Sequence, residues 1–201
     1  MRRRKASSPM ISDFRATTAA GALWAIWFIG WLITARWSAK TVARISGTSQ
    51  LSYSLFTWAG AILLFLHPRS LSGLLQPLHP TATRLPWVGV ALIAIGLGFS
   101  GWARSHLGRL WSGRVTLKED HAIIQTGPYS FVRHPIYTGL LIAVVGTLLT
   151  EITLAAIAGA VLLTIGLIMK IRQEERLLTN HFGAAYDDYR IQVAALIPYV
   201  W

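Results

Sequence analysis

The sequence contains no cysteine among its 201 residues. Disulfides, thiolate metal sites, cysteine nucleophiles and redox chemistry through protein thiols are therefore excluded. Acidic residues are scarce as well, since Asp and Glu number 8 against 19 Lys and Arg. Charged residues together make up 13% of the chain, well below the roughly 25% that is usual in a soluble domain. This composition excludes an ordinary soluble globular protein.

Apolar residues are abundant instead, at 53% of the chain, and they gather in blocks. A helix needs about 20 apolar residues to cross the hydrocarbon of a bilayer, with a range of roughly 17 to 25. Five blocks come close to that length, at residues 17–35, 51–66, 86–103, 136–150 and 152–169. We therefore predict an all-α, polytopic membrane protein with about five transmembrane helices and a C-terminal cytosolic or interfacial helical tail.

The blocks divide the chain into two regions of one integrated domain. Residues 1–103 form an N-terminal region with three transmembrane helices, and residues 104–201 form a core with a loop or re-entrant segment, a helical hairpin and the tail. The hairpin turns at Glu151. Small residues permit close helix approach where lipid provides no hydrophobic drive for association. Along the hairpin these are Gly139, Gly146, Gly159 and Gly166.

The tail continues the last apolar helix from Lys170 and breaks at Gly183. It then forms a second segment that ends in the apolar ALIPYVW at residues 195–201. We predict that this ending lies back on the membrane surface.

The net charge of +11 resides mainly in loops that flank apolar blocks, where Lys and Arg meet anionic lipid headgroups rather than nucleic acid. With five spans, twelve of the 19 basic residues lie on the side that holds residues 36–50, residues 104–135 and the tail. The excess favours a cytoplasmic position for that side and an outside N-terminus, although the basic MRRRK start argues the other way. We predict an integral multi-pass protein of the bacterial inner (plasma) membrane, with its active site facing the cytoplasm.

A polar motif, GPYSFVRHPIYTG, occupies residues 127–139 between a basic loop and the hairpin. Its two prolines and first glycine prevent a regular helix throughout, and Pro135 suits the first turn of the helix that follows. His134 then lies at a helix N-terminus, where unpaired N–H groups attract an anionic group. The alternative is that Arg133 and His134 only reach lipid headgroups and that Tyr137 is an interfacial anchor.

A second polar cluster, Glu174 and Glu175, follows the hairpin. Lys170 and Glu174 are i,i+4 neighbours on a helix, so decoration by salt links is one reading. Because a hairpin returns the chain to the side it left, Arg133, His134 and Tyr137 can also meet the two glutamates in space. The clusters together offer anion-accepting and cation-accepting groups at one depth, which suits an amphoteric ligand. S-adenosylmethionine is such a ligand. Its carboxylate would meet His134 with the helix N–H groups, its ammonium would meet Glu174, and its sulfonium would meet the ring of Tyr129 or Tyr137.

These motifs resemble those of the isoprenylcysteine carboxyl methyltransferase-like membrane methyltransferases, which are related to phospholipid N-methyltransferases. The resemblance covers roughly the C-terminal half, in LGRLWSGRVTLKEDHAIIQTGPYSFVRHPIYTG and EERLLTNHFGAAYDDYRIQVAALIPYVW. It rests on GPY, RHPxYxG, the paired glutamates and FGxxYxxY in that order around a hairpin. It implies S-adenosyl-L-methionine as cofactor, taken from the cytosol, and methyl transfer to a lipophilic or membrane-embedded carboxylate, amine or thiol.

The resemblance also implies site residues. The cofactor-binding set is Arg114, His121, Ala122, Ile123, Ile124, Tyr129, Arg133, His134, Pro135, Ile136, Tyr137 and Glu174. The catalytic set is Lys170, Arg172 and Glu175, where the resemblance implies that Lys170 or Arg172 orients the acceptor. From the chemistry alone, an amine acceptor has to be neutral, and Glu174, Glu175 or His121 would help to remove its proton. Two departures bear on acceptor contacts. Leu110 stands where an asparagine often precedes Trp-Ser, and residues 191–194 (IQVA) replace a more basic stretch.

The predicted partners are a lipophilic small-molecule or lipid substrate and membrane lipids, without nucleic acid, in an oligomeric state that the sequence leaves open. No metal is predicted. Two other functions fit the pattern. One is a membrane reductase of the sterol or steroid type that uses NADPH, and the other is a noncatalytic lipid-binding membrane protein.

Overall fold

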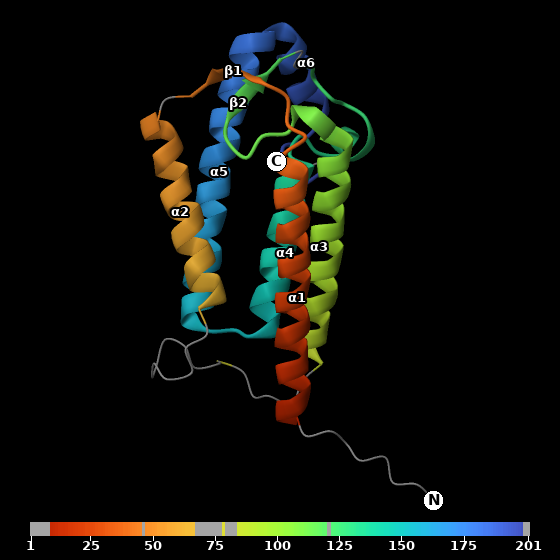
Figure 1. Cartoon of the computed structure of the whole chain (residues 1–201), viewed down its shortest axis with the longest axis vertical. Coiled ribbons are helices and arrows are strands. Elements are labelled where there is room, and N and C mark those ends of the chain that lie inside the picture. The colour runs from red at the N-terminus through yellow and green to blue at the C-terminus, as the bar shows by residue number, and fades with distance from the viewer. Residues whose placement is uncertain (1–8, 46, 67–77, 79–83, 120–121, 199–201) are drawn as a thin grey trace, which may run out of the picture.

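Five long helices form the body of the protein in the computed structural model, which describes residues 9–45, 47–66, 78, 84–119 and 122–198 (Figure 1). Their bounds are α1 Pro9–Ala35, α2 Gly47–Phe65, α3 Leu85–Leu107, α4 Pro135–Thr150 and α5 Leu154–Phe182. Each contains most of one predicted block, so the all-α prediction with five helices is confirmed. Three are long and apolar enough to cross a membrane by length and composition, over residues 15–35, 85–110 and 154–182.

Helix α4 is apolar but shorter, with 16 residues. At 1.5 Å per residue it is about 24 Å long, less than the roughly 30 Å of hydrocarbon in a bilayer. The helix ends at Thr150, next to the charged Glu151. It is therefore shorter than a full membrane span, and it begins at Pro135, directly after the polar Arg133 and His134.

Helices α3 and α4 are antiparallel and meet at two pairs of glycines that lie seven residues apart on each helix. A Cβ atom added to Gly89 would lie 2.5 Å from the carbonyl oxygen of Gly146, and one added to Gly146 would lie 2.6 Å from that of Gly89. Gly96 and Gly139 contact each other in the same reciprocal way. No side chain fits at these positions, so the two backbones pack directly against each other.

Helices α2 and α5 also pack closely at glycines. A Cβ atom on Gly60 would lie 2.7 Å from the carbonyl oxygen of Gly159, and the reciprocal distance is also 2.7 Å. One on Gly166 would lie 2.5 Å from Oγ1 of Thr57. The hairpin glycines therefore do allow close approach, as predicted, but their partners are α3 and α2 rather than the other helix of the hairpin.

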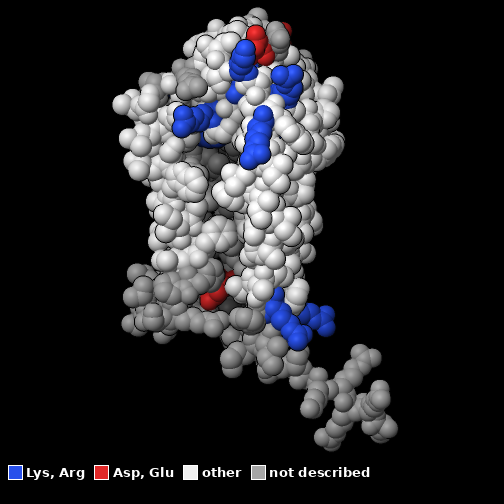
Figure 2. Space-filling model, viewed as in Figure 1, with Lys and Arg blue, Asp and Glu red and all other residues white. Residues whose placement is uncertain are grey.

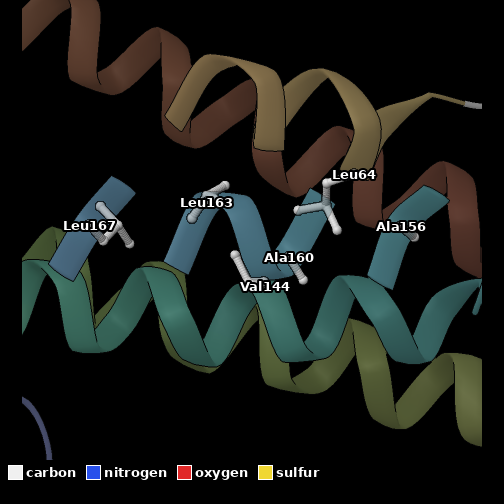
Figure 3. Packing of buried hydrophobic residues seen from close by; sticks show 6 residues of the cluster. All are labelled: Leu64, Val144, Ala156, Ala160, Leu163 and Leu167. Carbon is white, nitrogen blue, oxygen red and sulfur yellow. The ribbon is translucent and has the colours of Figure 1, made fainter. Parts of the chain in front are cut away.

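Small and branched apolar side chains fill the space where α2, α4 and α5 meet (Figure 3). The buried members are Leu64, Val144, Ala156, Ala160, Leu163 and Leu167. The hairpin helices thus pack through side chains, whereas each packs through its backbone on a helix from the N-terminal half. The N-terminal helices are in this way part of the framework that holds α4 and α5.

Two short strands, β1 Thr41–Arg44 and β2 Thr116–Lys118, pair in antiparallel fashion, with Arg44 opposite Thr116. No pattern in the sequence had indicated these strands. They join the loop after α1 to the loop after α3, and the Ser38 hydroxyl reinforces the junction by donating to the Trp111 carbonyl at 2.6 Å. Short 3₁₀ helices, η1 Gly108–Leu110 and η2 Gly127–Ser130, complete the loops.

The tail has the predicted form up to its last residues. Helix α5 continues to Phe182, Gly183 adopts a φ of +56°, and α6 Ala184–Gln192 follows. The prediction that residues 195–201 lie back on the membrane surface is corrected in part. Ala195 and Leu196 are buried at 3% and 4% exposure against the start of α4, and residues 199–201 lie outside the described part of the chain.

Charge is concentrated at the ends of the molecule (Figure 2). Lys and Arg gather around the end that holds α6, while the middle of the visible face has no charged side chain. This distribution is that of an integral membrane protein, whose apolar middle faces lipid.

Candidate functional site

An open cavity lies at the α6 end of the helices, between the loop after η1, the start of α4, the end of α5 and α6. The cavity volume is about 130 Å³, and the space free of protein atoms reaches about 860 Å³ when the open solvent at its mouth is included. Eleven of the twelve predicted cofactor-binding residues line it: Arg114, Ala122, Ile123, Ile124, Tyr129, Arg133, His134, Pro135, Ile136, Tyr137 and Glu174. The twelfth, His121, lies outside the described residues.

The segment that enters α4 is shaped by its own sequence. Gly127 has a φ of +58°, which glycine adopts readily and which starts the turn of η2. His134 is the N-cap residue and Pro135 the first helical residue, as predicted. The backbone N–H groups of Arg133 and His134 donate to the carbonyl oxygens of Ala194 and Ala195, at 2.8 and 3.0 Å. The C-terminal segment therefore pairs with the two N–H groups that directly precede α4, close to the helix N-terminus where a ligand carboxylate was expected.

Glu174 is the carboxylate that faces the cavity. The Tyr137 hydroxyl donates to its Oε1 at 2.6 Å, and Nδ1 of His134 lies 3.6 Å from its Oε2. The rings of His134 and Tyr137 are stacked, with centroids 5.8 Å apart. The two sequence motifs are therefore in direct contact across the hairpin, as the sequence predicted.

Glu175 has different surroundings and does not line the cavity. Its Oε1 accepts from Nε and Nη2 of Arg133, at 2.9 and 2.6 Å, and lies 3.2 Å from Nε2 of His134. Nη1 of Arg133 in turn donates to the carbonyl oxygens of Arg190 and Val193. All three guanidinium nitrogens are thus engaged within the protein, and this cluster clamps the C-terminal segment onto the start of α4. This geometry gives Glu175 a structural role in the clamp, and its predicted part in proton removal stays a prediction.

The two basic candidates for acceptor orientation are also separated. Arg172 is exposed, and neither it nor Lys170 lines the cavity. Lys170 Nζ lies 5.4 Å from the centroid of the Tyr137 ring and donates to the Gly113 carbonyl at 2.9 Å. Of the two, Lys170 is the residue that contacts the site.

Tyr129 and two tyrosines of α6 form the cavity wall beside η2. The Tyr189 hydroxyl donates to the Tyr129 carbonyl at 2.6 Å, and Tyr186 is buried at 2% exposure. Burial raises the pKa of all three phenols above their ordinary value. These residues therefore remain neutral and provide aromatic surface and hydroxyl groups, not negative charge.

Several lining residues were missed: Leu107, Leu110, Trp111, Ser112, Thr116, Leu177, Leu178, Tyr186 and Tyr189. Helical spacing contained part of the signal, since Leu177 and Leu178 follow Glu174 by three and four residues and share its side of α5. The tyrosines of FGxxYxxY are likewise three residues apart on one side of α6. Thr116 had no comparable signal, because its position depends on the unpredicted strand pairing.

The fold and the cavity define a polytopic helical membrane protein with a polar and aromatic site at one end of its helices. Comparisons with known proteins agree with the resemblance noted in the sequence. The family model of the isoprenylcysteine carboxyl methyltransferase (ICMT) family matches residues 87–180, just under half of the chain. These residues include the cavity-lining motif and both glutamates, so the chain is ICMT-like over this region.

Three curated relatives support the similarity. The nickel-cobalt-cadmium resistance protein NccN of Alcaligenes xylosoxydans xylosoxydans is 33% identical over 56% of this chain and 52% of the relative. Protein-S-isoprenylcysteine O-methyltransferase A of Arabidopsis thaliana is 34% identical over 43% of this chain and 45% of the relative. The corresponding Saccharomyces cerevisiae methyltransferase is 32% identical over 61% and 53%. The chain thus spans about half the length of the curated relatives it matches.

A solved structure of the eukaryotic intramembrane Ras methyltransferase ICMT has a similar fold. The TM-score is 0.53, with 21% sequence identity over 78% of this chain and 55% of the other. The helices of this protein therefore adopt an arrangement found in a membrane methyltransferase, and the function of the site has to be argued from its residues.

Proposed function

We propose that the protein transfers a methyl group from S-adenosyl-L-methionine to a lipophilic acceptor in the membrane. The observation that carries this proposal is the contact between Tyr137 and Glu174, 2.6 Å apart, on the wall of one cavity. Two motifs separated by the hairpin meet there, and both lie in the region that matches the ICMT family.

The cavity has groups that suit each part of this cofactor. The Glu174 carboxylate fits an ammonium group, and the aromatic faces of Tyr129 and Trp111 fit a sulfonium through cation–π attraction. Arg114 lines the same cavity and has the charge that fits a carboxylate. Leu177 and Leu178 provide apolar surface for a nucleoside. No further charged group is needed to match the ligand.

When bound, the cofactor supplies a methyl group activated by its sulfonium, and the acceptor's lone pair forms the new bond as the carbon–sulfur bond breaks toward sulfur. The protein has to align the two and exclude water. A carboxylate or thiolate acceptor needs no base. An amine acceptor would have to arrive neutral, because Glu174, the carboxylate among the described residues that line this cavity, is assigned here to the ammonium of the cofactor.

The acceptor would approach through the apolar part of the molecule. A row of indoles on α1 leads to the cavity, with Trp27 and Trp31 stacked at 4.3 Å and Trp31 in edge contact with Trp111 at 5.6 Å. Figure 2 shows a hollow on the face between α1 and α2. We propose lateral entry of the acceptor here and entry of the cofactor from the cytoplasm, in a bacterial inner membrane, since the basic residues at the cavity end favour that side.

Binding of adenosylmethionine to the purified protein in detergent tests the proposal. We expect saturable binding that Glu174→Ala and His134→Ala each weaken by more than about tenfold. The first substitution removes the partner of the ammonium, and the second removes the imidazole that lies 3.6 Å from the Glu174 carboxylate and helps to orient it. Unchanged affinity in both variants would refute the site. Protection from thermal unfolding by NADPH instead would select a reductase, and protection by neither would select a noncatalytic protein. Incubating a lipid extract with radiolabelled methyl donor then identifies the acceptor.

A further inference from the structure

Lys170 has two aromatic neighbours and one backbone partner. Its Nζ lies 5.4 Å from the ring centroid of Tyr137 and 5.7 Å from that of Tyr53. It donates to the Gly113 carbonyl at 2.9 Å. The ammonium thus connects α5 with α4, with α2 and with the tip of the loop between η1 and β2.

The position of Tyr53 follows from the close approach of α2 and α5. A Cβ atom on Gly166 would lie 3.0 Å from the Tyr53 carbonyl oxygen, so only glycine at that position lets the backbone of α2 come so near. Gly166 is one helical turn before Lys170 and lies on the same side of α5. Tyr53 is 4% exposed and lies outside the segment that matches the ICMT family. The N-terminal half therefore supplies one wall of the lysine's surroundings.

The loop that Lys170 holds is one wall of the cavity. Residues 111–116 contribute four lining residues: Trp111, Ser112, Arg114 and Thr116. The start of this loop is fixed by the Ser38 hydroxyl, and its end by pairing of β2 with β1. Its tip at Gly113 is exposed, and the hydrogen bond from Lys170 ties this tip to α5. Val115, two residues further along, is buried at 2% exposure, so the bond from Lys170 acts on the exposed tip of the loop.

We propose that Lys170 is a positioning residue that straps the 111–116 loop across the cofactor cavity. The Tyr53 and Tyr137 rings hold the ammonium by attraction to their faces, and the ammonium holds the Gly113 carbonyl. The wall is therefore in place before a ligand arrives, which lowers the entropy lost on binding. This inference rests on the proposed function. It differs from the role that the family resemblance implies for this lysine, which is orientation of the acceptor.

The two roles predict different affinities for the cofactor product when no acceptor is present. We expect Lys170→Met to weaken binding of S-adenosylhomocysteine by about tenfold in the absence of acceptor, and Lys170→Arg to restore most of the affinity. Arg176→Ala, at an exposed basic position of the same helix, is the matched control and should leave affinity unchanged. An unchanged affinity of Lys170→Met, combined with a raised KM for the acceptor, would overturn the strap and support acceptor orientation.

Trypsin cleavage after Arg114 in the ligand-free protein gives a second readout that does not depend on the proposed function. We expect Lys170→Met to raise the cleavage rate about fivefold, because the released tip opens more often. Tyr53→Leu should have the same effect to a smaller degree, because it removes the ring. Tyr53→Phe keeps the ring and removes only the hydroxyl beside the Val115 backbone, so it separates the contribution of the ring from that of the hydroxyl. Equal rates in all variants would overturn the inference, whereas failure of the wild type to bind S-adenosylhomocysteine would overturn only the proposed function.

Discussion

The middle of the helices and the end that holds the cavity are stabilised by different means. In the middle, backbone meets backbone at glycines, as between Gly96 and Gly139, and the contacts involve no charge. At the cavity end, a few charged and hydroxyl groups join segments far apart in the chain, as Arg133 and Glu175 do. The contacts in the middle depend on shape, because lipid gives helices no hydrophobic drive to associate. The contacts at the cavity end depend on charge, because a cavity at the edge of the membrane holds polar groups near water.

This comparison predicts that the two regions respond separately to substitution. A change of volume should act on folding in the middle of the helices. A change of charge or of one hydroxyl should act on the tail and on ligand affinity at the cavity end. Three substitutions test this separation.

The largest effect is expected from Gly96→Leu in the middle of α3. Its side chain would overlap the Gly139 carbonyl and approach the Ala143 nitrogen, where a Cβ atom alone would lie 2.7 Å away. Overpacking against backbone should destabilise the protein by more than about 3 kcal/mol. Loss of monodisperse protein in detergent is the measurement. Gly98→Leu is the control, since nothing lies within 4 Å of a Cβ atom there, and equal loss in both would contradict the packing.

A smaller loss of stability is expected from Arg133→Met at the cavity end. It removes both guanidinium hydrogen bonds to Glu175, which keeps only its weaker contacts with His134 and Arg190, and it removes a donor to the Val193 carbonyl. These losses should destabilise the protein by about 2–3 kcal/mol. Limited proteolysis should show earlier release of the C-terminal segment. Arg190→Ala serves as control, because that side chain is 43% exposed and its ion pairs contribute little in water. Equal protection of the tail in Arg133→Met and wild type would show that the clamp is unimportant.

The smallest effect is expected from Tyr137→Phe, which removes one hydroxyl and keeps the ring beside Lys170. Glu174 then loses its 2.6 Å hydrogen bond and its fixed orientation toward the cavity. Adenosylmethionine affinity should fall about three- to tenfold, close to 1 kcal/mol, with the melting temperature unchanged. Calorimetric titration together with thermal unfolding measures both. A shift in melting temperature without a change in affinity would place the role of this hydroxyl in the fold instead.

The sequence was a reliable guide where local pattern and chemistry coincide. The apolar blocks predicted the five helices, and Pro135 correctly marked the start of α4. The short hairpin correctly predicted that His134 and Tyr137 lie beside Glu174. The cofactor-binding residues implied by the family resemblance also line the cavity, apart from the undescribed His121, whereas Lys170, Arg172 and Glu175 of the catalytic set do not.

Neighbouring residues of one type were harder to tell apart. Glu174 and Glu175 are adjacent and identical in chemistry, yet one faces the cavity and the other the Arg133 clamp, because successive residues of a helix point about 100° apart. For the same reason Lys170 contacts the loop beside the site, whereas Arg172 is exposed.

The amino-acid sequence by itself determined that the chain folds as membrane helices and that two polar motifs meet at one end, because hydropathy and a short hairpin leave few other arrangements. Only the tertiary structure decided which helices approach through glycine, that the loops after α1 and α3 pair as strands, and that Tyr53 of α2 lies beside Lys170. These contacts join residues far apart in the chain. Their existence depends on the relative rotation and depth of whole helices, which no local pattern of residues specifies.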